Sequence, residues 1–131
     1  MFKVSEATAI ALHSVIYIAG KGDGISSLKE ISQKFSVSDN HLSKVLQRLV
    51  KEGIISSSKG PKGGFTIVPE YKNITFLEIY EIIEGKFKVN NCLFTSNSNN
   101  CSNCIMGDIL SKINNDFVDY MKNHKISDFS L

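Results

Sequence analysis

The sequence predicts a mainly α-helical fold with a small β-hairpin and a separate C-terminal helix. Apolar residues recur at helical spacing in four segments before residue 85, namely 5–19, 27–35, 38–52 and 75–84, and again after residue 104. Two short runs of strand-forming residues, 54–58 and 65–68, flank a glycine-rich turn. With 131 residues, the chain fits one domain with a short appended element.

The composition argues against a membrane protein and indicates an anionic partner. No segment reaches the ~18 unbroken apolar residues of a membrane span. The first residues lack the pattern of a secretory signal, so we expect a cytoplasmic protein that does not contact a membrane. Residues 21–64 hold eight Lys or Arg against four acidic residues, a local charge of +4, whereas the rest of the chain carries −2. Such a basic segment is typical of phosphate contact, although an ordinary solvated surface would look the same.

The first predicted helix spans residues 5–19. Ser5 is placed to cap its start, and Gly20 is placed to take the left-handed position after its end. Apolar residues lie all round this helix, so it should be buried on most sides. His13 and Ser14 are its only polar interruptions after Thr8.

Two further helices predict a helix-turn-helix unit. Ser27 and Glu30 form the pattern of a capping box at the start of the second helix. Residues 36–38 form a turn, and Ser38 can cap a third helix that runs to about residue 52. The apolar faces are formed by Leu28, Ile31 and Phe35 in one helix and by Leu42, Val45, Leu46 and Leu49 in the other.

The third helix has a polar face, and the hairpin that follows it is typical of the wing of a winged helix-turn-helix. A recognition helix reads base edges with its N-terminal residues, here Asn40, His41 and Lys44. Lysines and glycines in 59–64 would let the tip of the wing approach phosphate closely. A solvated face would be the simpler interpretation of an isolated helix, but the helix-turn-helix context favours DNA. The residues expected to bind double-stranded DNA are Lys29, Ser38, Asn40, His41, Ser43, Lys44, Gln47, Arg48, Lys59, Lys62 and Gly63.

The C-terminal third of the chain divides into a loop and a helix. A helix over 75–84, with a capping box at Thr75 and Glu78, closes a DNA-binding domain of residues 1–85. Residues 86–104 then form a cysteine-containing loop, and residues 105–131 form a helix to about residue 125 and a tail. Apolar spacings of four, three, four and three favour packing against a second copy, with packing on its own domain as the alternative. The expected dimer interface consists of Met106, Leu110, Ile113, Phe117 and Tyr120.

Three cysteines, Cys92, Cys101 and Cys104, lie within 13 residues, and the chain has no others. An odd number in an apparently cytosolic chain argues against a disulfide framework, and the clustering favours a ligand set or a redox site. Soft thiolates suit an iron–sulfur cluster. The Cys-x2-Cys step suits zinc equally well, and a thiol redox switch is a third interpretation.

The order of elements and several strings resemble the Rrf-two family of winged helix-turn-helix transcriptional regulators. The matching strings are ALHSVIYIA at 11–19, VSDNHLSKVLQRL at 37–49 and KGPKGGF at 59–65, followed by Ile74-Thr75 and Ile83-Glu84-Gly85. The resemblance covers nearly the whole chain. It implies a homodimer that is joined by long C-terminal helices and binds a partly palindromic operator. We expect this dimer to act as a repressor.

The resemblance also implies a sensing site at the cysteines. Sensing members carry three cysteines in this place, where they hold an iron–sulfur cluster, 2Fe-2S or 4Fe-4S, that responds to redox state, iron or nitric oxide. The spacing here is less even than the common pattern, and Gly107 stands where some relatives have a histidine. The fourth ligand is therefore unassigned. His13 of the partner subunit is the first candidate, with a core position as its alternative, and Asp108 and Glu6 are weaker because carboxylates suit soft clusters poorly.

Two other classes of protein fit the sequence less well. No glycine-rich phosphate loop follows a strand and no Ser-His-Asp set is suggested, so we do not expect an enzyme. A winged helix that binds protein instead of DNA would favour an acidic recognition face, whereas this face is basic.

Overall fold

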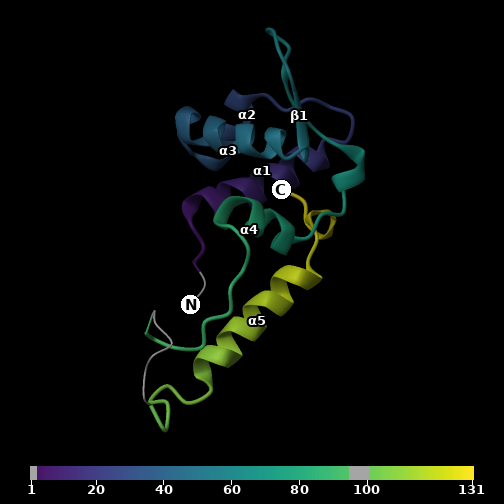
Figure 1. The fold of residues 1–131 in the computed structure, drawn as a ribbon. Helices are drawn as coiled ribbons and strands as arrows, with labels where there is room; N and C mark the ends of the chain where they lie inside the picture. The colour runs from purple at the N-terminus through teal and green to yellow at the C-terminus, as the bar shows by residue number, and fades with distance from the viewer. Residues whose placement is uncertain (1–2, 95–100) are drawn as a thin grey trace.

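A computed structural model describes residues 3–94 and 101–131. It confirms the mainly α-helical fold with one two-stranded sheet (Figure 1). The elements are α1 (Glu6–Gly20), α2 (Leu28–Phe35), α3 (Asp39–Lys51), β1 (Ile55–Ser58), β2 (Gly64–Ile67), the 3₁₀ helix η1 (Pro69–Tyr71), α4 (Phe76–Glu84), α5 (Ile109–Asn123) and the 3₁₀ helix η2 (Ile126–Asp128). In the described part of the chain, no helix is long and apolar enough to cross a bilayer.

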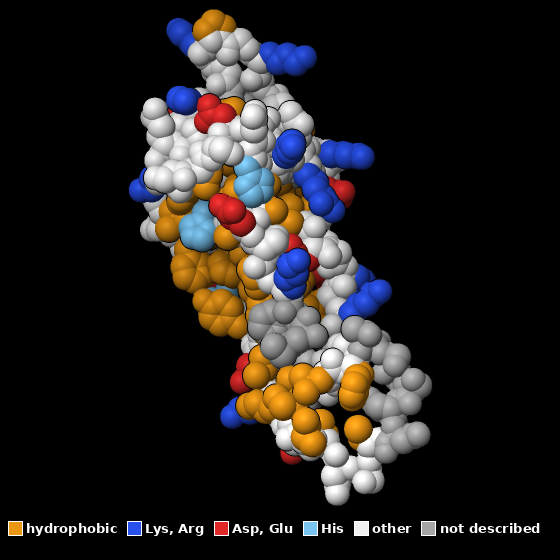
Figure 2. Space-filling model, turned by 90° about the vertical axis from the view of Figure 1, so that its left-hand side faces the viewer, with side chains coloured by type: hydrophobic (Ala, Val, Ile, Leu, Met, Phe, Trp, Pro, Cys, Tyr) orange, Lys and Arg blue, Asp and Glu red, His pale blue; other side chains and the backbone are white. Residues whose placement is uncertain are grey.

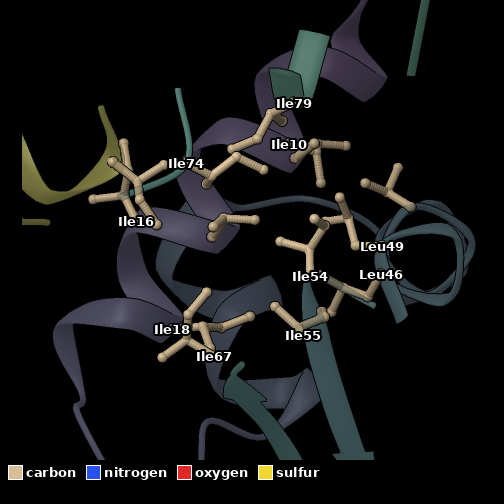
Figure 3. Close-up of a cluster of buried hydrophobic side chains, with 14 of the residues drawn as sticks. Ile10, Ile16, Ile18, Leu46, Leu49, Ile54, Ile55, Ile67, Ile74 and Ile79 are labelled. Atoms are coloured by element: carbon tan, nitrogen blue, oxygen red, sulfur yellow. The ribbon is translucent and has the colours of Figure 1, made fainter. Parts of the chain in front are cut away.

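Helix α1 is the central element of the core. It packs against α3, α4, the hairpin and η2, which explains why apolar residues surround it in the sequence. Figure 3 shows side chains from α1, α3, α4 and the hairpin pointing into one cluster. The labelled members are Ile10, Ile16, Ile18, Leu46, Leu49, Ile54, Ile55, Ile67, Ile74 and Ile79. At about 25 cal/mol per Å² of apolar surface removed from water, such a cluster is the main stabilising term of the fold.

Serine and threonine caps define where the helices begin. The side chains of Ser5, Ser27, Ser38 and Thr75 each accept a hydrogen bond from a backbone N–H three residues on, as the sequence predicts. At Thr75 the capping box is complete, because the Glu78 carboxylate accepts from the Thr75 backbone N–H at 2.8 Å. The capping box predicted at Ser27 and Glu30 is only half present. The Glu30 carboxylate instead accepts hydrogen bonds from the Lys21 ammonium and the Tyr17 hydroxyl, which lower the pKa of Glu30.

The prediction that Gly20 takes a left-handed conformation is wrong. Gly20 is the last residue of α1, Lys21 is right-handed at φ −80°, and the left-handed residue is Gly22 at φ +59°. The chain therefore leaves the helical conformation later than the sequence indicates, inside the turn Lys21-Gly22-Asp23-Gly24.

The hairpin is held to the body by a short pairing with the turn before α2. Strands β1 and β2 are antiparallel, with Ile55 opposite Ile67 and Ser58 opposite Gly64. Ser26 and Phe65 exchange two backbone hydrogen bonds, of 3.0 and 2.8 Å. This contact fixes the base of the wing beside the start of the helix-turn-helix.

Helix α5 begins later than predicted. Residues 105–108 form a turn in which Gly107 is left-handed at φ +57°, and the helix starts at Ile109. Met106 therefore lies outside the helix, and its predicted heptad position is wrong. The inward face of α5 is formed by Leu110, Asn114, Phe117 and Met121.

Candidate functional site

Helices α2 and α3 and the hairpin lie at one end of the molecule, and the hairpin projects from it (Figure 1). One side of α3 is buried in the core through Leu42, Val45, Leu46 and Leu49. The opposite side carries the polar residues that the sequence predicts to read DNA. Of these, Asn40, Lys44, Gln47 and Arg48 are exposed, and His41 and Ser43 are partly exposed.

The N-terminus of α3 carries an acidic residue, Asp39, beside the polar residues predicted to read DNA. The Asp39 carboxylate accepts from the Lys29 ammonium at 3.3 Å, and both side chains are exposed. The Ser32 hydroxyl and the Lys29 ammonium lower the pKa of Asp39. Asp39 stabilises the helix N-terminus, and Lys29 offsets its charge at the end of the helix that would face phosphate. Ser38 acts as the cap, accepting from the His41 backbone N–H at 3.1 Å, so its hydroxyl proton and one further lone pair remain for DNA.

The tip of the wing combines exposed lysines with tight backbone packing. Lys59 and Lys62 are exposed, and Figure 2 shows Lys or Arg side chains at the tip of the molecule. A Cβ at Gly63 would lie 2.2 Å from the Ser58 carbonyl oxygen, and one at Gly64 would lie 2.4 Å from the Ser26 carbonyl oxygen. Glycine is thus required here by the chain's own close approaches, whether or not these backbone amides also meet phosphate.

The cysteines lie in the segment between α4 and α5, which has no regular secondary structure where it is described. Cys92 is partly buried, and Cys101 and Cys104 are exposed. In residues 3–94 and 101–131, no three His, Cys, Asp or Glu side chains are grouped closely enough to hold a metal ion. The structure therefore does not bring the three predicted thiolates together in a preformed site.

His13 is exposed on the outer side of α1, so its alternative assignment as a core residue is wrong. Its Nδ1 atom lies 2.6 Å from the Ala9 carbonyl oxygen, and its ring meets Phe35 edge-on with centroids 5.4 Å apart. With Nδ1 donating to that carbonyl, Nε2 is the atom that could bind a ligand. Glu6 and Asp108 are also exposed, and neither is grouped with the cysteines.

The predicted dimer residues divide between two sides of the chain. Leu110 is buried, and Phe117 packs within its own chain, with ring centroids 5.5 Å from Tyr80 and 5.7 Å from Phe87. Tyr120 is half exposed, and Ile113 is partly exposed. Ile113 and Tyr120, and Met106, which is also partly exposed, therefore leave surface that another subunit could cover.

Comparison with known proteins decides the family. The family model for Rrf2, the Rrf-two family, described as an iron-dependent transcriptional regulator, matches residues 4–130. The chain belongs to the Rrf2 family. It is 29% identical over 129 residues to an HTH-type transcriptional regulator of Aquifex aeolicus, covering 95% of this chain and 88% of the relative. It is 31% identical over 100 residues to the transcriptional regulator NsrR of Bacillus subtilis, covering 76% of this chain and 68% of that protein.

The fold of this Rrf2 chain is also that of a solved regulator. The structure of CymR, the global cysteine regulator of Bacillus subtilis, matches with a TM-score of 0.77 at 23% identity, over 98% of this chain and 95% of CymR. These comparisons confirm the winged-helix fold and the resemblance to the family. They make the chain a DNA-binding transcriptional regulator and not an enzyme.

Sequence reasoning missed two polar residues of this Rrf2 protein. Glu84, at the end of α4, accepts hydrogen bonds from the hydroxyls of Ser5 and Thr8, and so ties α4 to the start of α1. Asn114 is wholly buried in α5. Its position could have been predicted from helical spacing, because Asn114 lies four residues after Leu110 and seven before Met121, on the inward face of α5.

Proposed function

We propose that this Rrf2 protein is a homodimeric repressor that binds operator DNA through α3 and the wing and senses its signal through an iron–sulfur cluster at Cys92, Cys101 and Cys104. The observation that carries the proposal is the position of the three cysteines. They lie in one segment, 86–104, between the winged domain (1–85) and the C-terminal region with α5 (105–131), and two of them are exposed. The family's description as iron-dependent supports the same assignment.

The proposed DNA contacts are of two chemical kinds, those to base edges and those to phosphates. Asn40, His41 and Lys44 at the start of α3 would read base edges, as in other recognition helices. Lys29, Lys59 and Lys62 would contact phosphates, which position the protein and carry no sequence information.

The dimer proposal rests on apolar surface that the chain leaves uncovered. Tyr120 and Leu131 are each 50% exposed and Phe129 is 42% exposed, and they line a hollow of about 220 Å³ together with Leu12 and Ile16 of α1. Figure 2 shows hydrophobic and histidine side chains gathered in the middle of this face. Surface of this kind marks an interaction site. A second copy that covers it would bring α1 and the outer side of α5 into the interface.

The residues present suit an iron–sulfur cluster in chemistry but are not preassembled. Three thiolates are the preferred donors for such a cluster, which when bound would supply redox and iron sensitivity to the segment. The thiols are not grouped in the structure, so the segment would have to rearrange to hold it. His13 of the partner subunit is our proposed fourth ligand, through Nε2.

The placement of the segment accounts for regulation. Because residues 86–104 join the DNA-binding domain to α5, binding of a cluster there would change the angle between the two recognition helices of the proposed dimer. Half-sites lie ~34–36 Å apart in the major groove, so a small change in angle costs affinity.

The test is an oxygen-free purification followed by iron and sulfide counts and an absorption spectrum. Loaded and unloaded protein are then titrated against a duplex selected from a random pool. We expect coloured protein with iron and sulfide in equal amounts and a different affinity in the two forms. Colourless protein with stoichiometric zinc would contradict the iron–sulfur proposal and leave the DNA-binding function intact.

A regulator without a cluster is the second candidate. The specific observation in its favour is that the thiols are not grouped. Cys101 and Cys104 could then bind zinc or form a thiol redox pair. Zinc content and the redox state of the thiols, measured on the same sample, separate the two candidates.

A further inference from the structure

Asn114 of α5 holds the chain just before the first cysteine. It is 0% exposed, and its Nδ2 donates to the Asn90 carbonyl oxygen at 3.0 Å and to Asn91 Oδ1 at 3.0 Å. The Cys92 backbone N–H in turn donates to Asn90 Oδ1 at 3.0 Å. A connected set of hydrogen bonds therefore runs from the inside of α5 through Asn90 to the backbone of Cys92.

A second contact holds the same stretch on α5 one turn further along. The Phe87 ring stacks on Phe117, with centroids 5.7 Å apart, and lies 6.0 Å from Tyr80 of α4. Phe117 and Asn114 are three residues apart, so they lie on the same face of the helix. Residues 87–92 thus follow α5 for at least one turn, as the ribbon in Figure 1 shows.

Packing alone does not explain an asparagine at this position. The neighbouring inward positions of α5 hold Leu110, Phe117 and Met121. The Oδ1 atom of Asn114 is buried and accepts no hydrogen bond within the described residues. Burying a polar group that is only half satisfied is unfavourable, whereas leucine has a similar volume and would suit an apolar face. The gain from asparagine is its two donor bonds to residues 90 and 91.

We infer that Asn114 is a positioning residue, which fixes the Cys92 end of the cysteine segment against α5 and so couples the state of the thiols to the dimer helix. The coupling rests on the proposed function, because it needs a ligand or an oxidation event at the cysteines. The positioning of Cys92 does not, and it can be measured without any metal.

The first experiment measures thiol alkylation in the metal-free, reduced full-length protein. Iodoacetamide modification of each cysteine is followed by mass spectrometry in the wild type, in Asn114→Ala and in the control Asn115→Ala, an exposed neighbour on α5. We expect Asn114→Ala to raise the rate at Cys92 about tenfold, as for the loss of two ordinary hydrogen bonds, and to leave Cys101 and Cys104 unchanged. An unchanged rate at Cys92, or an equal rise at all three cysteines, would overturn the inference.

Two further variants keep this test decisive if the alanine variant does not fold. Asn114→Leu fills the space, so it should keep the melting temperature while still releasing Cys92. Asn91→Ala removes one acceptor at an exposed position, and should raise the Cys92 rate about threefold. A merely structural role for Asn114 predicts the opposite pattern, with a loss of stability in Asn114→Leu and no effect of Asn91→Ala.

The second experiment tests the coupling in protein loaded with iron and sulfide. The ratio of affinities of the loaded and unloaded forms for the selected duplex should fall at least threefold in Asn114→Leu and stay constant in Asn115→Ala. If the wild type takes up iron and the ratio does not change in Asn114→Leu, the coupling is overturned. If the wild type takes up no iron, the proposed iron–sulfur function fails, and the alkylation pattern still decides the role of Asn114.

Discussion

Replacing Lys62 by alanine should weaken DNA binding to every sequence by a similar factor. Lys62 is exposed at the tip of the wing, and neither ion pair in the described part of the chain involves it. Its ammonium is therefore available for a phosphate, and phosphate contacts contribute affinity through the release of counterions. The loss should appear in the salt dependence of binding more than in the preference for one sequence.

The size of the effect follows from the number of phosphates that the variant no longer neutralises. Each neutralised phosphate contributes about 0.9 to the slope of log K against log salt, and a dimer with the substitution in both subunits leaves two phosphates without their lysine. The slope should therefore become shallower by about 1.8. Between 1 M and 0.15 M salt this corresponds to about 1.5 in log K, or an affinity about 30-fold weaker at the lower concentration.

The assay is a fluorescence anisotropy titration of a labelled duplex at four or more salt concentrations. Lys112→Ala is the matched control, because Lys112 is exposed on α5 and is not among the proposed DNA contacts. We expect parallel losses on the selected duplex and on a scrambled one for Lys62→Ala, with no change for Lys112→Ala. An unchanged slope for Lys62→Ala, or the same change for Lys112→Ala, would refute the assignment of the wing.

Three other groups of substitutions test the remaining parts of the site. Phe117→Asp should destabilise the fold by about 2–4 kcal/mol because it places a charge between aromatic rings of the same chain. Tyr120→Asp should cost less stability, since Tyr120 is 50% exposed and its ring contacts are with His124 and Phe76, and it should shift sedimentation towards monomer. Replacing any one of the three cysteines by alanine should bleach the anaerobic protein, and His13→Ala should alter the spectrum with little loss of stability, since His13 is exposed; an unchanged spectrum would remove it as a ligand. Gly63→Ala should destabilise the hairpin, because a Cβ there meets a backbone carbonyl at 2.2 Å, and a stable variant with normal DNA affinity would contradict that packing.

Much of the fold was predictable because local signals and tertiary packing agree. The caps at Ser38 and Thr75 are both followed by an apolar face at helical spacing, and both helices begin where the caps indicate. The predicted capping box at Ser27 and Glu30 is incomplete because the Glu30 carboxylate binds partners outside its own helix. The Tyr17 hydroxyl and the Lys21 ammonium reach the carboxylate from α1 and the turn after it, and no spacing rule within a helix contains that contact.

The candidate site was predictable in its residue types and less so in its geometry. The polar face of α3 follows from helical periodicity, so its exposed residues could be named in advance. The heptad pattern in 106–120 could not distinguish a partner subunit from the chain's own α4. In the structure Phe117 packs against Tyr80 of α4, whereas Tyr120 is half exposed. No pattern in the C-terminal tail predicted that Ile126 lies in the core, where it is 1% exposed. The Ile126 backbone N–H donates to the Ile74 carbonyl oxygen at 3.1 Å.

The pairing of Ser26 with Phe65 has a consequence for the footprint on DNA. Because β2 is hydrogen-bonded to the turn that precedes α2, we expect the wing and the helix-turn-helix to move as one DNA-binding unit. In the proposed dimer, a signal at the cysteines would then move one DNA-binding unit relative to the other without changing the shape of either. The base pairs protected within a half-site should accordingly be identical in both states, and only the spacing tolerated between half-sites should differ.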